Sequence, residues 1–191
     1  GGMAVVYRVR HATLGTRHAL KVLSITSSDV KERLIQEGRV QATLRHPNVI
    51  GVSDVLDVAG APGLLMEFIQ GPALDHWLHN YQPSVEEALT IFRGIVAGVG
   101  HAHSKGLIHR DLKHANVMLH VDEHGVHPKV TDFGLAKLTD SGDKRRTRTG
   151  TTMGTPAYMS PEQIRDASTV DRRADLYSLG CILYELVCGC T

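Results

Sequence analysis

The spacing of apolar positions changes along the chain and predicts a β-rich first part. Residues 5–9 and 18–22 have the length and β-branched content of short strands, and a turn containing Gly15 joins them as a hairpin. From Ser28 to Leu44 the apolar residues recur at three- and four-residue spacings, which predicts a helix. Residues 49–58 and 64–69 read as a second hairpin around a turn at 60–63.

After Gly71 the pattern becomes mainly helical, so we place a domain boundary there. Helices are predicted at 73–80, 84–104 and 172–187, and Ser84 with Glu87 matches a capping box at the start of the second. Short strands are expected around 107–108, 117–119 and 129–131. Residues 139–156 lack apolar periodicity and read as a long loop, which inside a compact domain is usually functional.

Composition places the chain among soluble globular proteins. Of 191 residues, 42% are hydrophobic and 21% charged, and the net charge is +1. This balance argues against a generalised grip on nucleic acid or anionic lipid, and no run of about 18 apolar residues could span a bilayer. The three cysteines, Cys181, Cys188 and Cys190, form no CxxC pair and are interpreted as reduced cytosolic thiols.

Three motifs carry the candidate chemistry. Residues 109–116 read His-Arg-Asp-Leu-Lys-His-Ala-Asn, residues 132–134 read Asp-Phe-Gly, and residues 160–162 read Ser-Pro-Glu. The first places an Asp, a Lys and an Asn on one short loop, and the second places another Asp just after a predicted strand. Such a set can accept a hydroxyl proton, bind a phosphate and hold divalent cations through oxygen ligands.

In order and spacing these motifs resemble those of the protein kinase superfamily, in particular the eukaryotic-type serine/threonine kinases of bacteria. Residues 1–7, 18–21, 66–69 and 154–163 add to the resemblance, which covers the whole chain. It implies an α+β, two-lobed fold. Residues 1–69 would form the small ATP-binding lobe, an antiparallel sheet with one helix. Residues 70–191 would form a mainly helical lobe with the catalytic loop and the activation segment.

Both ends of this fold are expected to be missing. The chain starts without Met and closes directly after a helix-like run, so we expect the first strand of the small lobe and the later helices of the large lobe to be absent. The Arg partner that the resemblance implies for Glu162 would lie among those helices. The fragment is expected to be cytoplasmic and without membrane contact, while relatives often continue into a membrane segment.

The resemblance assigns the catalytic roles. Asp111 would orient the acceptor hydroxyl and take its proton, and Lys113 would stabilise the transferring γ-phosphoryl group of ATP; Lys113 also favours Ser or Thr over Tyr as acceptor. Asn116 and Asp132 would hold two Mg²⁺ ions, with Mn²⁺ as an alternative. Lys21 would contact the α- and β-phosphates and pair with a carboxylate of the first helix, where Glu37 is the candidate and Glu32 the fallback.

The nucleotide would lie against the small lobe. By the resemblance, Gly1 matches the second glycine of the phosphate loop and Gly2 follows it in the loop, while the first glycine would lie before the chain. Because Ala4 replaces the third glycine, we expect weakened rather than lost nucleotide affinity. By the resemblance, Met66 would be the gatekeeper beside the adenine, and the backbone of Glu67 and Ile69 would bond the adenine edge. The alternative is that residues 64–69 are simply a buried strand, and both can hold.

The remaining assignments concern regulation and support. Phosphorylation is expected at Thr147 and Thr149, then Thr151, and the phosphate would pair with Arg110 or Lys137 and order the loop. The supporting residues are assigned as follows: Thr155 positions the acceptor, His109 packs under Phe133 of the Asp-Phe-Gly triplet that ends at Gly134, and Asp175 bonds the catalytic-loop backbone. Trans-autophosphorylation would involve a kinase dimer.

Several alternatives stay open. The basic run 144–148 could be a nucleic-acid patch, but is read as activation-segment surface, and a zinc site at His101 and His103 is weaker than a structural role. Gly38 costs the first helix roughly 1 kcal/mol relative to Ala, and Gln41 is polar where relatives pack an apolar residue. With Ala4 and the missing ends, these departures motivate a second hypothesis, a kinase-like regulatory or binding module with little turnover.

Overall fold

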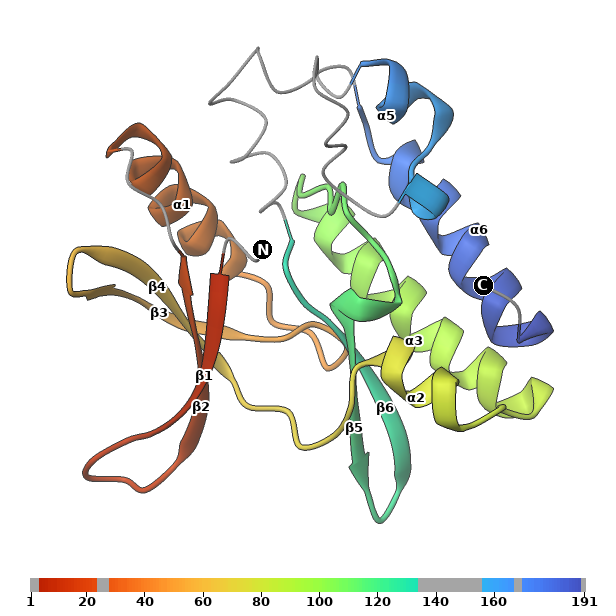
Figure 1. Ribbon diagram of the computed structural model, residues 1–191, viewed down its shortest axis with the longest axis horizontal. Helices are drawn as coiled ribbons and strands as arrows, with labels where there is room; N and C mark the ends of the chain where they lie inside the picture. Colours follow the sequence, from red (N-terminus) through yellow and green to blue (C-terminus); the bar gives the residue numbers. More distant parts are fainter. Residues whose placement is uncertain (1–3, 24–27, 134–155, 167–169, 190–191) are drawn as a thin grey trace. The chain divides into compact units, whose positions relative to one another are not determined.

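The computed structural model describes residues 4–23, 28–133, 156–166 and 170–189, apart from several side chains between 28 and 37. The chain divides into two compact units, one made of residues 1–46 and 50–69, the other of residues 47–49 and 70–191 (Figure 1). Residues 47–49 therefore group with the second unit, although they were expected in the first lobe. The Asn48 carbonyl accepts from the Val130 N–H, and the Asn48 side chain donates to the Pro128 carbonyl at 2.9 Å.

In the residues that the structure describes, the first unit is a four-stranded antiparallel sheet with one helix, as the apolar pattern predicts. Strands β1 (Ala4–Arg10), β2 (Arg17–Leu23), β3 (Val52–Val58) and β4 (Ala61–Glu67) lie in the order β1-β2-β4-β3, and α1 spans Ser28–Gln41. The turn of the second hairpin was placed too late in the sequence. It is formed by Ala59 and Gly60, whose φ angles of 51° and 87° are typical of a two-residue type I′ turn.

Helix α1 packs directly on β3 and β4, and Gly38 permits the close approach. A Cβ atom at this position would lie 2.9 Å from Val55 Cγ2 and 3.0 Å from Leu64 Cδ2. The glycine therefore lowers the helix propensity of α1 but leaves room for the apolar side chains beneath it. Gln41, the other departure on this helix, is buried.

The second unit contains most of the helices. Its elements are α2 (Leu74–Asn80), α3 (Val85–Ser104), the 3-10 helix η1 (His114–Asn116), β5 (Val117–Asp122), β6 (Gly125–Val130), the 3-10 helix η3 (Pro156–Tyr158), α5 (Pro161–Arg165) and α6 (Arg173–Cys188). The predicted capping box of α3 is confirmed, with both Ser84–Glu87 hydrogen bonds present. Helix α3 packs against β6 and α6, and its buried face includes Ile91, Ile95 and Val99.

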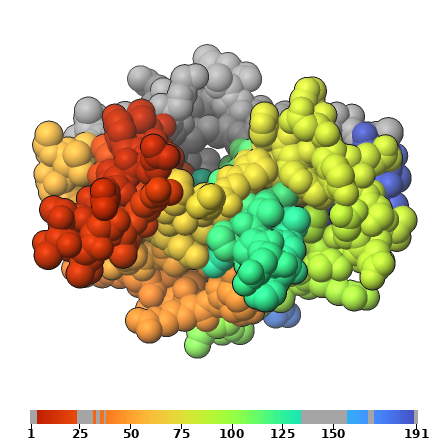
Figure 2. Space-filling view, turned by 90° about the horizontal axis from the view of Figure 1, so that it is seen from below, coloured from red at the N-terminus to blue at the C-terminus, as the bar shows by residue number. Residues whose placement is uncertain are grey.

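The strand predicted around residues 107–108 is wrong. The Leu107 N–H bonds back to the Ala102 carbonyl at 3.0 Å, so it closes the end of α3 instead of joining a sheet. The strands around 117–119 and 129–131 pair as one hairpin, β5–β6, whose tip lies on the surface next to the helices of this unit (Figure 2). Gly71 lies against β5, and a Cβ there would overlap the Leu119 carbonyl oxygen.

Candidate functional site

The loop between α3 and β5 brings together two expected catalytic side chains, Asp111 and Lys113, and the expected metal ligand Asn116. Lys113 Nζ donates to Asp111 Oδ2 at 2.8 Å, and Asn116 Nδ2 donates to the Asp111 carbonyl at 2.7 Å. Asp111 and Lys113 are half-buried, whereas Asn116 is buried in η1. The loop thus presents a carboxylate with a cation beside it, and the neighbouring amide fixes its backbone.

Asp132 lies beside this loop because of strand pairing. The Thr131 N–H donates to the Asn116 carbonyl at 2.9 Å. Asp132 is the next residue, so this bond places it next to η1. Asp132 has a φ of 66°, and Arg110, next to Asp111, has a φ of 69°. Left-handed conformations cost energy in residues other than glycine and persist where surrounding contacts impose them, which happens often at functional sites.

His109 is fully buried and connects the loop to the end of β6. Its Nε2 bonds the Thr131 carbonyl at 2.8 Å, and its Nδ1 accepts from the Asp111 N–H at 3.3 Å. This pair of contacts requires the neutral tautomer protonated on Nε2. The ring also packs against Phe133, with centroids 4.8 Å apart.

Asp175 fastens the same loop to α6. Its carboxylate accepts from the His109 N–H at 2.8 Å, the Arg110 N–H at 2.9 Å and His103 Nε2 at 2.7 Å. Burial raises the pKa of Asp175, but these hydrogen bonds outweigh burial and its pKa is lowered. For His103 a structural role was favoured over a zinc site, and its contact with Asp175 is of that kind. In the described part of the chain, no group of three or more His, Cys, Asp or Glu side chains could hold a metal ion.

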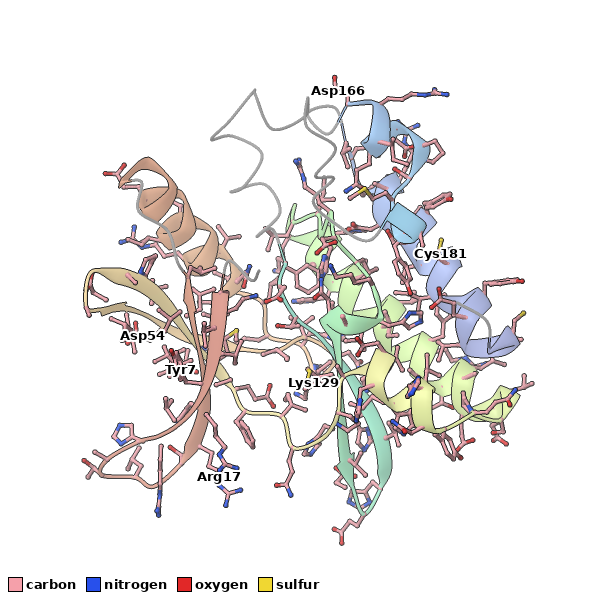
Figure 3. All side chains as sticks on the ribbon, in the orientation of Figure 1. Tyr7, Arg17, Asp54, Lys129, Asp166 and Cys181 are labelled. Carbon is pink, nitrogen blue, oxygen red and sulfur yellow. The ribbon has the colours of Figure 1, made fainter. Side chains whose placement is uncertain are left out.

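Residues 156–166 are bound to both the loop and α6. Gln163 Nε2 donates to the Arg110 carbonyl at 2.5 Å, Ser178 Oγ to the Tyr158 carbonyl at 2.8 Å, and Cys181 Sγ to the Ala157 carbonyl at 3.5 Å. Figure 3 labels Cys181 on the part of α6 next to η3. These contacts were missed from the sequence: Gln163 belongs to the matched run 154–163, but no contact was assigned to it, and Ser178 belongs to no motif. Glu162 is exposed on α5.

The expected nucleotide-binding residues of the first unit lie on its two central strands and the segment after them. Lys21 is half-buried on β2, where it pairs with Val6 of β1 and Leu64 of β4. Met66 and Ile69 are buried, and the Glu67 N–H donates to the Gly51 carbonyl at 2.9 Å.

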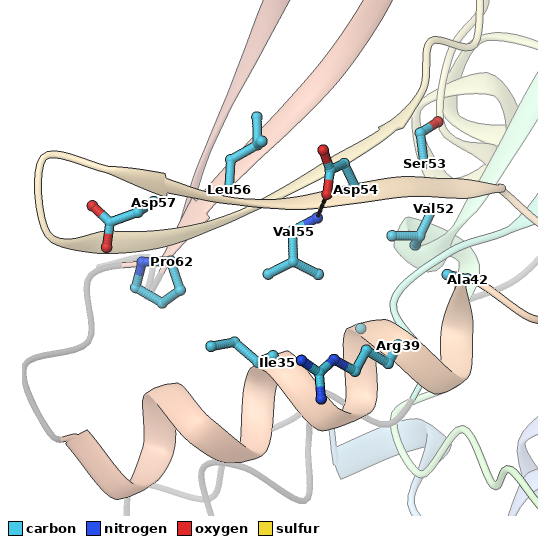
Figure 4. A pocket seen from close by; sticks show the side chains of 11 residues that line it. Ile35, Arg39, Ala42, Val52, Ser53, Asp54, Val55, Leu56, Asp57 and Pro62 are labelled. Atoms are coloured by element: carbon cyan, nitrogen blue, oxygen red, sulfur yellow. Dashed lines mark hydrogen bonds between the residues drawn. The ribbon is translucent and has the colours of Figure 1, made fainter.

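A groove of about 470 Å³ lies between α1 and β3, and the sequence did not predict it. Figure 4 shows Ile35, Val55 and Pro62 on its apolar walls, with Arg39 on the helix and Asp54 and Asp57 on the strand. No residue assigned a catalytic or nucleotide-binding role lines it.

Several predicted residues lie outside the described part of the chain. They are Gly1, Gly2, Gly134, Lys137, Thr147, Thr149, Thr151, Thr155 and the side chain of Glu37. The described helices include none long and apolar enough to cross a membrane.

Comparisons with known proteins agree with the motifs. Residues 1–191 match the family model described as "Protein kinase domain". The chain is 39% identical over 195 residues to the DNA damage-responsive serine/threonine-protein kinase RqkA of Deinococcus radiodurans, covering 99% of this chain and 28% of that protein. It is 41% identical over 199 residues to the serine/threonine-protein kinase pkn3 of Myxococcus xanthus, covering 99% and 36% respectively.

A solved structure, Rad53 1-466 in complex with AMP-PNP, matches with a TM-score of 0.77 and 27% identity, covering 100% of this chain and 46% of that one. The two-lobed fold expected from the sequence is therefore confirmed as a class. This chain spans only 28% to 36% of the two curated relatives.

Proposed function

The chain belongs to the protein kinase domain family, and on that premise we propose that it transfers the γ-phosphoryl group of ATP to Ser or Thr hydroxyls of proteins. One observation carries the proposal. The Asp111 carboxylate lies 2.8 Å from Lys113 Nζ on a loop that also holds Asn116 and adjoins Asp132. The names of the serine/threonine kinases to which the chain is similar support the acceptor class.

The side chains divide the chemistry between proton and phosphate. Asp111 orients the acceptor hydroxyl and takes its proton as the oxygen attacks the γ-phosphorus and the bond from that phosphorus to the β-phosphate oxygen breaks, which releases ADP. Lys113, already paired with Asp111, places its positive charge where the transferring phosphoryl oxygens gather negative charge. The hydrogen bonds from the His109 and Arg110 N–H groups to the buried Asp175 hold the loop that carries Asp111 in position. This matters because a small misplacement of reacting groups lowers the rate strongly.

The residues near Asp111 also fit Mg²⁺. Because Asn116 Nδ2 donates to the Asp111 carbonyl, its Oδ1 is the atom left for a cation, and Asp132 supplies a carboxylate. Amide and carboxylate oxygens are the ligands that Mg²⁺ prefers. When bound, Mg²⁺ neutralises negative charge on the phosphate oxygens.

The remaining assignments extend the proposal. Lys21 would bind the α- and β-phosphates and Glu37 would pair with it, while Met66, Glu67 and Ile69 would line the adenine site. Phosphorylation of the activation segment, trans-autophosphorylation in a dimer, use of Mn²⁺ and a cytoplasmic location stay predictions.

The test is transfer of labelled phosphate from ATP to a generic basic protein by the intact protein. Asp111→Asn removes the proton acceptor and is expected to lower transfer about 10²-fold or more. Lys21→Met is also expected to lower transfer, because it removes the charge assigned to the α- and β-phosphates of ATP. Glu123→Gln, at the exposed tip of the β5–β6 hairpin, is the matched control and should transfer as the parent does. Equal incorporation by the parent and by Asp111→Asn would refute the proposal.

The second candidate is a kinase-like module that binds nucleotide with little turnover. Ala4, which begins β1 at a position where the resemblance implies a glycine, and the buried Gln41 on α1 favour it. Thermal stabilisation by ATP and Mg²⁺ without measurable transfer would select this function over catalysis.

A further inference from the structure

A cluster of three polar side chains, two buried and one half-buried, lies behind the catalytic loop in the second unit. His114 Nδ1 lies 2.7 Å from the Tyr158 hydroxyl and 2.6 Å from Glu185 Oε2, and the Tyr158 hydroxyl donates to the same Glu185 oxygen at 2.7 Å. His114 is 3% exposed and Glu185 is 9% exposed. The His114–Tyr158–Glu185 cluster thus joins η1, η3 and α6, segments that lie far apart in sequence.

The distances define how the protons are shared. The Tyr158 hydroxyl donates its proton to Glu185 Oε2, so its oxygen accepts from the N–H at Nδ1 of His114, and the three side chains form a chain from His114 through Tyr158 to Glu185. The His114 and Tyr158 rings also meet edge to face, with centroids 5.4 Å apart at 76°. Burial and Glu185 raise the pKa of Tyr158, so the hydroxyl keeps its proton. Loss of the His114 donor would leave the Tyr158 hydroxyl oxygen without this bond, and loss of the Tyr158 hydroxyl would take a donor from the buried Glu185 carboxylate.

The cluster is linked through η1 to Asp111, the proposed proton acceptor. His114 begins the 3-10 turn that ends at Asn116, and Asn116 holds the Asp111 carbonyl at 2.7 Å. On the other side, Ser178 of α6 binds the Tyr158 carbonyl at 2.8 Å. A shift of His114 would therefore move Asn116 and Asp111 relative to Tyr158.

We propose that His114 is a positioning residue that fastens the catalytic loop to Tyr158 and Glu185 and so fixes Asp111 relative to the segment that receives the protein acceptor. This inference rests on the proposed kinase function. Tyr158 follows Thr155, the residue assigned to acceptor positioning, whereas the expected ATP-binding residues Lys21 and Met66 lie in the other unit. Loss of the cluster should consequently affect turnover with a protein acceptor more than the KM for ATP.

The test uses two substitutions that differ in whether they keep the hydrogen-bond donor. His114→Phe keeps an aromatic ring but lacks the donor, and His114→Asn keeps an N–H near the position of Nδ1. His124→Phe, on a residue whose side chain is 77% exposed at the hairpin tip, is the control. In the intact protein, His114→Phe is expected to lower kcat for a protein acceptor about tenfold or more, with the KM for ATP within about twofold, because the hydrogen bond that holds the loop to Tyr158 is lost.

Rescue and coupling separate positioning from packing. His114→Asn should recover most of the lost kcat, and His114→Phe combined with Tyr158→Phe should cost less than the product of the two single effects. Equal losses in His114→Phe and His114→Asn, or strictly multiplicative effects in the double variant, would overturn the proposal.

Amide hydrogen exchange distinguishes this proposal from the proposed function. His114→Phe is expected to speed exchange in residues 109–116 and 156–160 together, while His114→Asn and His124→Phe leave it near that of the parent. If the parent transfers no phosphate yet shows this pattern, the positioning role stands and the kinase activity fails. If the parent transfers phosphate and exchange is unchanged in His114→Phe, the positioning role fails alone.

Discussion

Replacing Asp175 with Asn should release the catalytic loop from α6 with almost no change in side-chain shape. The parent carboxylate is 1% exposed and accepts from two backbone N–H groups, those of His109 and Arg110, and from His103. Both carboxylate oxygens are used, so either orientation of an amide places an NH₂ group against at least one buried donor.

The size of the effect follows from those bonds. One buried N–H left without an acceptor costs about 1–3 kcal/mol, and the remaining bonds lose the charge that strengthens them. We therefore expect Asp175→Asn to destabilise the loop by about 2–4 kcal/mol. Since about 1.4 kcal/mol corresponds to a factor of ten, the local opening equilibrium should increase about 30-fold or more.

Hydrogen exchange at pH 7, read in peptides that cover residues 107–112, measures this change in the intact protein. Asp171→Asn is the matched control, because Asp171 is exposed near the start of the same helix and bonds Arg173 at 3.1 Å. Exchange should accelerate in Asp175→Asn and stay unchanged in Asp171→Asn. Equal protection of residues 107–112 in Asp175→Asn and the parent would refute the reasoning.

The pH dependence has a definite sign. The pKa of Asp175 is lowered by folding, so its stabilisation is present above its ordinary pKa of 3.8 and is lost as the pH falls through the folded value. The difference between the parent and Asp175→Asn should therefore be constant near neutrality and shrink below about pH 3.8.

Two further predictions concern packing and capping. Gly38→Ala should lower the free energy of unfolding by about 1–3 kcal/mol through overpacking against Val55 and Leu64, partly offset by about 1 kcal/mol of helix propensity. Gly180→Ala, with open space around it, should raise the free energy of unfolding by about 1 kcal/mol. Urea unfolding of both variants checks this, and stabilisation by both changes would contradict the packing argument. Ser84→Ala should lower stability by about 1 kcal/mol through loss of the α3 cap, and an unchanged urea midpoint would show that the cap contributes nothing.

The local sequence pattern was enough to predict most helices and strands, because alternation and capping act between residues that are close in sequence. Alternating runs became β1 and β2, and the capping box at Ser84 begins α3 as predicted. The errors arise where the chain closes on itself over a few residues. A short apolar pair at 107–108 looks like a strand until the Leu107 N–H is seen to bond the end of α3.

The site divides in the same way. Asp111, Lys113 and Asn116 are close in sequence, so their association on one loop follows from spacing alone. His114, Tyr158 and Glu185 meet only after α6 packs behind the loop, and no periodicity connects positions 44 and 27 residues apart. The burial of His114 is likewise a tertiary property, since the same residue in an exposed loop would be solvated.

Because Arg110 and Asp132 have left-handed backbone conformations, selection for stability and selection for catalysis should favour different residues at these positions. Glycine adopts such φ angles without the roughly 1 kcal/mol cost borne by other residues. Glycine at either position would relax the backbone, yet at Asp132 it would also delete the carboxylate that the proposed metal site needs. A library sorted only for folding should therefore drift toward glycine at these two positions, whereas one sorted for phosphate transfer should retain Asp132 despite its strain.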